Sequence, residues 1–88
     1  MRSWEVQLQD GTKVTVNNLL NCIGDTYPRP QLKLKKSLKG MESGEIDEVL
    51  ISNPPSLETF PALCQEIGAT HLDSLMEPNL WKFYIQKD

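Results

Sequence analysis

The chain has 88 residues, which suffices for one domain with a single modest core and is too short for two. Its hydrophobic content of 39% and charged content of 24% fit a globular protein, and no apolar run reaches the roughly 18 residues of a membrane span. The net charge of −3 argues against a general nucleic-acid binder, although five of the nine basic residues lie close together: Arg29, Lys33, Lys35, Lys36 and Lys39.

The N-terminus predicts a β-hairpin. Apolar and polar residues alternate in WEVQLQ, and Asp10-Gly11 suits the positive-φ positions of a type I′ turn. We expect strands on both sides of this turn, followed by strand exit and loop over residues 17–27. Because this region lacks the apolar block of a signal peptide, we also expect a cytoplasmic protein.

A helix and a strand are predicted next. Leu34, Leu38 and Met41 form one stripe of an amphipathic helix over residues 30–41, with lysines on its other faces. Residues 45–52, EIDEVLIS, predict a strand at the centre of a sheet, because the strand ends without a polar face.

A second helix over residues 55–67 carries Cys64 on its apolar face and ends at Gly68. Two strands, 71–76 and 80–87, complete the chain. The order is therefore ββαβαββ. Right-handed crossovers place both helices on one face of a mixed sheet of four to five strands, a two-layer α/β sandwich of the α+β class.

Several short motifs occur in a specific order: Gly24, Pro28-Arg29-Pro30, LKLKKSLKGM, Ser43-Gly44-Glu45, Ser52-Asn53-Pro54, FPALCQEIG and WKFYIQK. Together they resemble the small sulfur-carrier family of TusA and SirA. The resemblance implies one domain over 1–88, in which residues 13–88 form the family's βαβαββ core. Residues 1–12 would add a hairpin strand and turn, and that strand could pair with the family's first strand at the sheet edge.

The family opens its first helix with Cys-Pro-x-Pro, and this chain has Tyr27 where the persulfide-carrying cysteine stands. Pro28 and Pro30 fix φ at about −65° in the first turn. The helix N-terminus, with Arg29 and Lys33, creates a positive potential that would stabilise a thiolate. A phenol, with a pKa of about 10, forms no persulfide, so Tyr27 cannot inherit that role.

We therefore predict a binding surface at the start of this helix, formed by Tyr27, Pro28, Arg29, Pro30, Lys33 and Lys36. Tyr27 could anchor a protein interface or pack over the sheet edge. The lysines could contact an acidic partner or form an ordinary solvated helix face.

Two cysteines remain, and both are expected to be free thiols. Cys64 is predicted to be a buried core residue. Cys22, in the predicted loop before Tyr27, is predicted to be a loop or core thiol, with sulfur carriage as the alternative. His71 has no partner identifiable from spacing and is predicted to be solvated or packed. No CxxC pair exists, so we expect neither a metal site nor a cofactor.

The leading prediction is a degenerate TusA/SirA-like domain, a monomer that binds or regulates a protein partner of a sulfur-relay system and is not an enzyme. The alternative is an active sulfur carrier, or sulfurtransferase, that uses Cys22.

A third prediction is RNA binding, because the βαβαββ layout also resembles the C-terminal domain of the third bacterial translation initiation factor. Against it stand the pI of about 5.0 and the lack of an aromatic pair among the lysines. A cluster of acidic residues argues the same way: Glu42, Glu45, Asp47 and Glu48.

Overall fold

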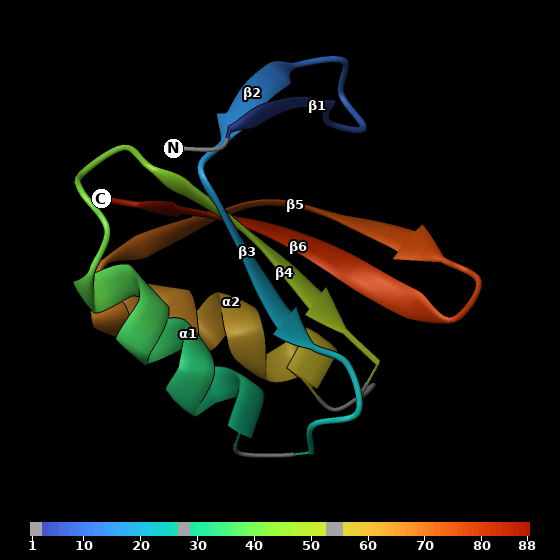
Figure 1. Cartoon of the computed structure of the whole chain (residues 1–88), viewed down its shortest axis with the longest axis vertical. Coiled ribbons are helices and arrows are strands. Elements are labelled where there is room, and N and C mark those ends of the chain that lie inside the picture. Colours follow the sequence, from blue (N-terminus) through green and yellow to red (C-terminus); the bar gives the residue numbers. More distant parts are fainter. Residues whose placement is uncertain (1–2, 27–28, 53–55) are drawn as a thin grey trace.

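The computed structural model describes residues 3–26, 29–52 and 56–88, with backbone alone over 56–61. Its elements are β1 (Trp4–Gln7), β2 (Lys13–Val16), β3 (Asn18–Cys22), α1 (Arg29–Lys39), β4 (Ile46–Ile51), α2 (Ser56–Ile67), β5 (Ala69–Glu77) and β6 (Leu80–Lys87). The predicted α+β class is confirmed, and Figure 1 shows both helices on the same side of the larger sheet. Neither helix, over the described residues, is long and apolar enough to cross a membrane.

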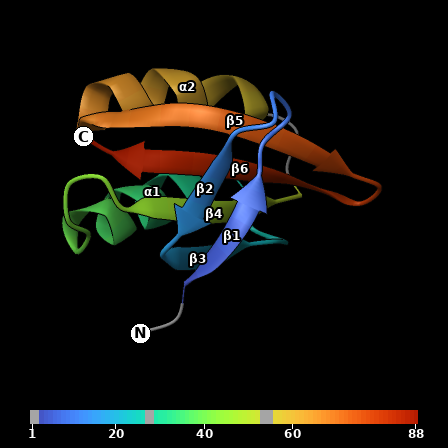
Figure 2. The ribbon, with the colours of Figure 1, turned by 90° about the horizontal axis from the view of Figure 1, so that it is seen from above.

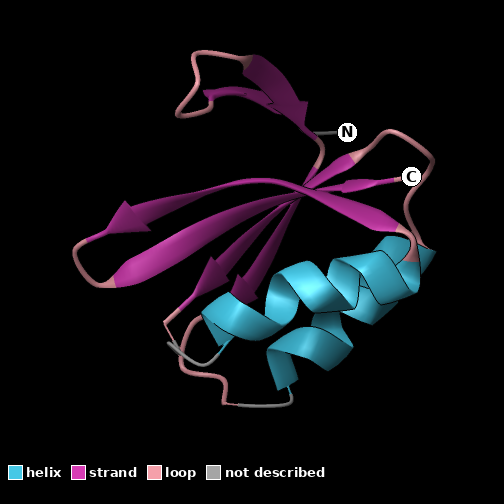
Figure 3. Cartoon of the chain, turned by 180° about the vertical axis from the view of Figure 1, so that it is seen from behind, coloured by secondary structure: helices cyan, strands magenta, loops and turns pink. Residues whose placement is uncertain are grey.

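The larger sheet is mixed and has the strand order β3-β4-β6-β5. β3 runs parallel to β4, and β6 runs antiparallel to both of its neighbours. β4 is therefore an inner strand, as its apolar sequence predicts. The helices cover one face (Figure 3), and the main core lies between them and the sheet: Cys22, Leu34, Leu38, Met41, Val49, Ile51, Cys64, Ala69, Phe83 and Ile85.

β1 and β2 form a separate two-stranded antiparallel sheet. This hairpin lies across the face of the larger sheet that the helices leave open (Figures 1 and 2). A second core joins Leu8 and Val16 of the hairpin region to Ile46 and Tyr84 of the sheet. The expected pairing of the first strand at the sheet edge is wrong, because the hairpin buries its apolar side chains by stacking on the sheet.

The hairpin loop also differs from the predicted type I′ turn. Such a turn needs positive φ at two successive residues, and only Gly11, with φ of 92°, has it. The Leu8 N–H donates to the Thr12 carbonyl oxygen at 2.7 Å, and the Thr12 N–H donates to Asp10 Oδ1 at 2.9 Å. The loop thus spans the five residues between Gln7 and Lys13, whose Cα atoms pair across the strands.

Residues 18–22 form β3, where the sequence predicted strand exit and loop. Leu20 and Cys22 pack into the main core, while Leu19 between them is exposed. The Asn17 side chain accepts a hydrogen bond from the Ile46 N–H at 2.9 Å and thereby fixes the start of β3 beside β4. The element order is therefore βββαβαββ, with four strands in the main sheet.

Candidate functional site

The segment between β3 and α1 is held against the end of β4. Gly24 has φ of 85°, a conformation that favours glycine, and its N–H donates to Ser52 Oγ at 2.8 Å. The Asp25 N–H donates to the Cys22 carbonyl oxygen at 3.1 Å. These bonds fix the path of the chain toward the start of α1.

α1 begins at Arg29, whose N–H donates to the Thr26 carbonyl oxygen at 2.9 Å. The Arg29 side chain is exposed, whereas Pro30 is fully buried and packs the first turn of α1 against the protein interior. Tyr27 and Pro28, the centre of the predicted binding surface, lie outside the described residues. Of the proline pair, the structure thus describes Pro30 alone.

Lys33 is directed toward the loop before the helix. Its Nζ forms an ion pair with Asp25 and donates to the Asn21 carbonyl oxygen at 3.3 Å. Because Asp25 compensates this charge, Lys33 contributes less to the potential at the helix start than the sequence predicts. Its exposed neighbours on α1, Arg29 and Lys36, carry the positive charge there.

Leu32 is a further feature of this surface. Its side chain is 59% exposed, and it follows Arg29 by three residues and precedes Lys36 by four. Residues at these spacings share one face of a helix. The exposure of Leu32 could have been predicted from the sequence, because Leu32 lies off the apolar stripe formed by Leu34 and Leu38. The start of α1 therefore presents an apolar side chain between two cations.

Both thiols are buried in the main core. Cys22 is fully buried at the end of β3, and Cys64, on α2, is 1% exposed. Burial raises the pKa of each thiol to about 11; Asp25 and Asp47 add to the rise for Cys22, and Lys33 opposes it. Only about one thiol in ten thousand is then ionised at neutral pH. The prediction of a buried core thiol is confirmed for Cys64. Of the two predicted placements of Cys22, the core one is confirmed, at the end of a strand and not in a loop.

His71 is a packed residue, in line with one of the two predicted placements. Its ring lies against Phe83, with the ring centroids 5.4 Å apart, and burial lowers its pKa. His71 and Cys64 line one hollow of about 410 Å³, together with Gln65, Ala69 and Thr70. Since burial favours the neutral form of both side chains, they do not make a thiolate–imidazolium pair.

The sequence did not reveal a buried polar network beneath α1. Asp47, on β4, is fully buried and accepts hydrogen bonds from Ser37 Oγ at 2.7 Å and Asn18 Nδ2 at 3.0 Å. Burial raises the pKa of Asp47, while these two donors oppose the rise. The burial of one carboxylate could have been predicted, because the adjacent residues Asp47 and Glu48 point to opposite faces of the strand and the helices cover one of these faces.

On the opposite face, Glu48 is buried and accepts a hydrogen bond from the Tyr84 hydroxyl at 2.7 Å. Two members of the acidic cluster, Asp47 and Glu48, therefore do not contribute to an acidic surface. These two carboxylates therefore would not repel an RNA phosphate at the surface, and the acidic cluster disfavours RNA binding less than the sequence predicts. Among the described residues, no group of three or more histidine, cysteine, aspartate or glutamate side chains could hold a metal ion.

A sequence model of the family described as sulfurtransferase TusA matches residues 18–87. The chain belongs to this family. The match begins at the first residue of β3, so the β1–β2 hairpin precedes the part shared with the TusA family.

Two curated relatives agree with this assignment. A Thermotoga maritima protein, provisionally described as a sulfur carrier protein, is 35% identical over 75 residues, which cover 84% of this chain and 95% of the relative. The sulfur carrier protein TusA of Allochromatium vinosum is 34% identical over 68 residues, covering 77% of this chain and 90% of the relative.

The fold is also that of a solved structure. The crystal structure of a SirA-like protein from Desulfitobacterium hafniense superposes with a TM-score of 0.69 and covers 80% of this chain and 96% of its own. The two sequences are 21% identical, so this likeness shows the fold alone.

Proposed function

We propose that this chain is a TusA-family domain that binds or regulates a protein partner of a sulfur-relay system and does not itself carry sulfur. The burial of both thiols is the observation that supports this proposal most strongly. Cys22 and Cys64 are 0% and 1% exposed, and burial raises both pKa values to about 11. A sulfur carrier needs an accessible thiolate, and Tyr27 offers none at the position of the family's motif cysteine.

The proposed partner surface lies at the start of α1. The exposed Leu32 between Arg29 and Lys36 combines an apolar anchor with a cationic rim, which suits a partner with an apolar contact and acidic surroundings. Tyr27, directly before this surface in the chain, would enlarge the contact as a second anchor.

Sulfur transfer through Cys22 is the weaker alternative. Cys22 packs among Leu34 and Ile51 in the main core, so a persulfide there would require that core to open. RNA binding is weaker still, because the chain is acidic overall and its cations at the helix start surround an apolar side chain.

The proposal is tested by incubating the protein with a cysteine desulfurase and cysteine, followed by intact-protein mass spectrometry. We expect no added sulfur on the native chain. Cys22→Ser and Cys64→Ser variants assign any sulfur that is found. Stoichiometric sulfur that disappears in Cys22→Ser would establish the alternative and overturn the proposal.

A further inference from the structure

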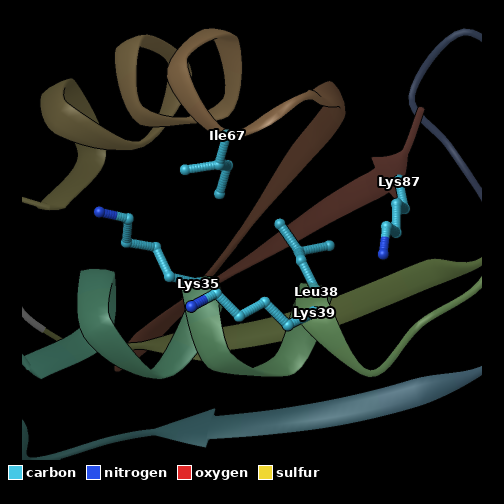
Figure 4. A pocket seen from close by; sticks show the side chains of 5 residues that line it. All are labelled: Lys35, Leu38, Lys39, Ile67 and Lys87. Atoms are coloured by element: carbon cyan, nitrogen blue, oxygen red, sulfur yellow. The ribbon is translucent and has the colours of Figure 1, made fainter.

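A pocket of about 260 Å³ lies between α1, the end of α2 and the end of β6. α1 contributes Lys35, Leu38 and Lys39, while Ile67 and Lys87 complete the lining (Figure 4). It lies along the C-terminal half of α1, next to the proposed partner surface, and shares no lining residue with it. Leu38 and Ile67 form the apolar part of this lining, the floor of the pocket, and three lysines form the rest.

No carboxylate whose side chain the structure describes forms an ion pair with the lysines of this pocket. Among the described residues, the ion pairs are Lys33–Asp25 and Lys82–Glu77, and neither involves the pocket. Lys87 Nζ donates to the Met41 carbonyl oxygen at 2.7 Å, which leaves its charge uncompensated by a carboxylate. The pocket therefore holds a formal charge of three within a small area.

Favourable interaction with helix ends explains only part of this arrangement. Lys39 lies in the last turn of α1, where a cation complements the partial negative charge of the terminal carbonyl groups. That charge is about half an electron per helix end, so the ends of α1 and α2 together offset about one of the three lysines. Lys35, one turn earlier, and Lys87, on a strand, still line the same pocket.

We propose that this pocket docks an acidic segment of a protein partner, with one apolar side chain over Leu38 and Ile67 and carboxylates facing Lys35, Lys39 and Lys87. Charge complementarity favours an anionic occupant, and the apolar floor favours one that also brings an aliphatic or aromatic group. A nucleic-acid phosphate backbone would bring no apolar group to contact Leu38 and Ile67. This interaction goes beyond the proposed function, because it uses other side chains than the proposed partner surface and requires no statement about sulfur.

The test is an NMR titration of the ¹⁵N-labelled full chain with a capped pentapeptide, Glu-Asp-Leu-Asp-Glu. We expect saturable shifts of the amides of Leu38, Lys39, Ile67 and Lys87, with an affinity in about the millimolar range. Replacing the central leucine of the peptide by glycine should weaken binding about tenfold, because the floor then gains no apolar contact.

Charge-removing variants locate the interaction. Lys35→Gln and Lys39→Gln should each weaken binding about threefold to tenfold. Lys13→Gln, on the exposed hairpin strand β2, removes the same charge elsewhere and should leave the affinity unchanged. The ¹⁵N spectrum of each variant shows whether the fold is intact.

Four results would overturn the proposal. They are the absence of saturable shifts, an equal loss of affinity in Lys13→Gln, equal binding of the leucine and glycine peptides, and stronger shifts of the same amides by an oligouridylate. The last result would assign the pocket to nucleic acid. None of these results depends on the desulfurase experiment, so either proposal can be rejected while the other stands.

Discussion

At the residue scale, burial decides what the two cysteines can do. Cys22 and Cys64 lie in one core on the helix face of the sheet, and burial favours the protonated form of each thiol. The thiolate therefore becomes the main species only above a pH of about 11, whereas the pKa of an unburied cysteine thiol is 9.0.

This predicts slow alkylation. At pH 7 to 8, iodoacetamide should modify the native protein about 100-fold more slowly than a small free thiol, from ionisation alone, and the rate should rise with pH. In denaturing urea both cysteines should react at the rate of the free thiol. Mass spectrometry of timed samples measures the rates. A cysteine that reacts in the native protein as fast as the free thiol at pH 7 would contradict the burial.

The buried carboxylate of Asp47 makes a second prediction. Ser37→Ala removes one of its two side-chain donors and should lower the free energy of unfolding by about 1–2 kcal/mol, since alanine's better helix propensity offsets part of the loss. Ser43→Ala, at an exposed turn position, is the matched control and should change it by less than about 0.5 kcal/mol. Urea denaturation measures both; equal effects would show that the hydrogen bond contributes nothing.

At the element scale, the sequence predicted those elements that have a clear apolar pattern within their own residues. α1, β4, β5 and β6 lie within one to two residues of their predicted bounds because their apolar periodicity is strong. β3 was missed because Asn17, Asn18 and Asn21 resemble loop residues. Two of these asparagines hydrogen-bond to Ile46 and Asp47 of β4, contacts that no local pattern reveals.

The position of the hairpin could not be predicted from a local pattern either. Its strands were predicted, but where they pack depends on Tyr84 and Ile46, more than 25 residues later in the chain. The candidate site could be predicted only in part for the same reason. The burial of Cys22 and the pairing of Lys33 with Asp25 depend on tertiary contacts, which a local sequence pattern does not reveal. The exposed position of Leu32 was readable from the helical spacing.

Because the hairpin shares a core with the main sheet, the two should unfold together. Val16 is fully buried, so Val16→Ala should lower the free energy of unfolding by about 1–3 kcal/mol in a single transition. Val14→Ala, at a half-buried hairpin position, should cost less. Urea denaturation followed by both fluorescence and circular dichroism tests this. Two separate transitions would show that the hairpin is an independent unit.

At the scale of the whole molecule, the hairpin and the helices divide the surface. The family core, residues 18–87, carries its helices on one face, and the added hairpin covers the other (Figure 2). Among the side chains that the structure describes, those of α1 place clustered cations beside an exposed apolar residue, Leu32. The molecule thus keeps the fold of a sulfur-carrier family and offers a basic helix surface without an accessible thiol.

The central claim is tested most directly by comparing the native chain with Tyr27→Cys and Tyr27→Ser in the desulfurase incubation. The account predicts no added sulfur on the native chain or on Tyr27→Ser, and one added sulfur atom on Tyr27→Cys, located at position 27 by peptide mapping. Stoichiometric persulfide on Cys22 or Cys64 of the native chain would contradict it.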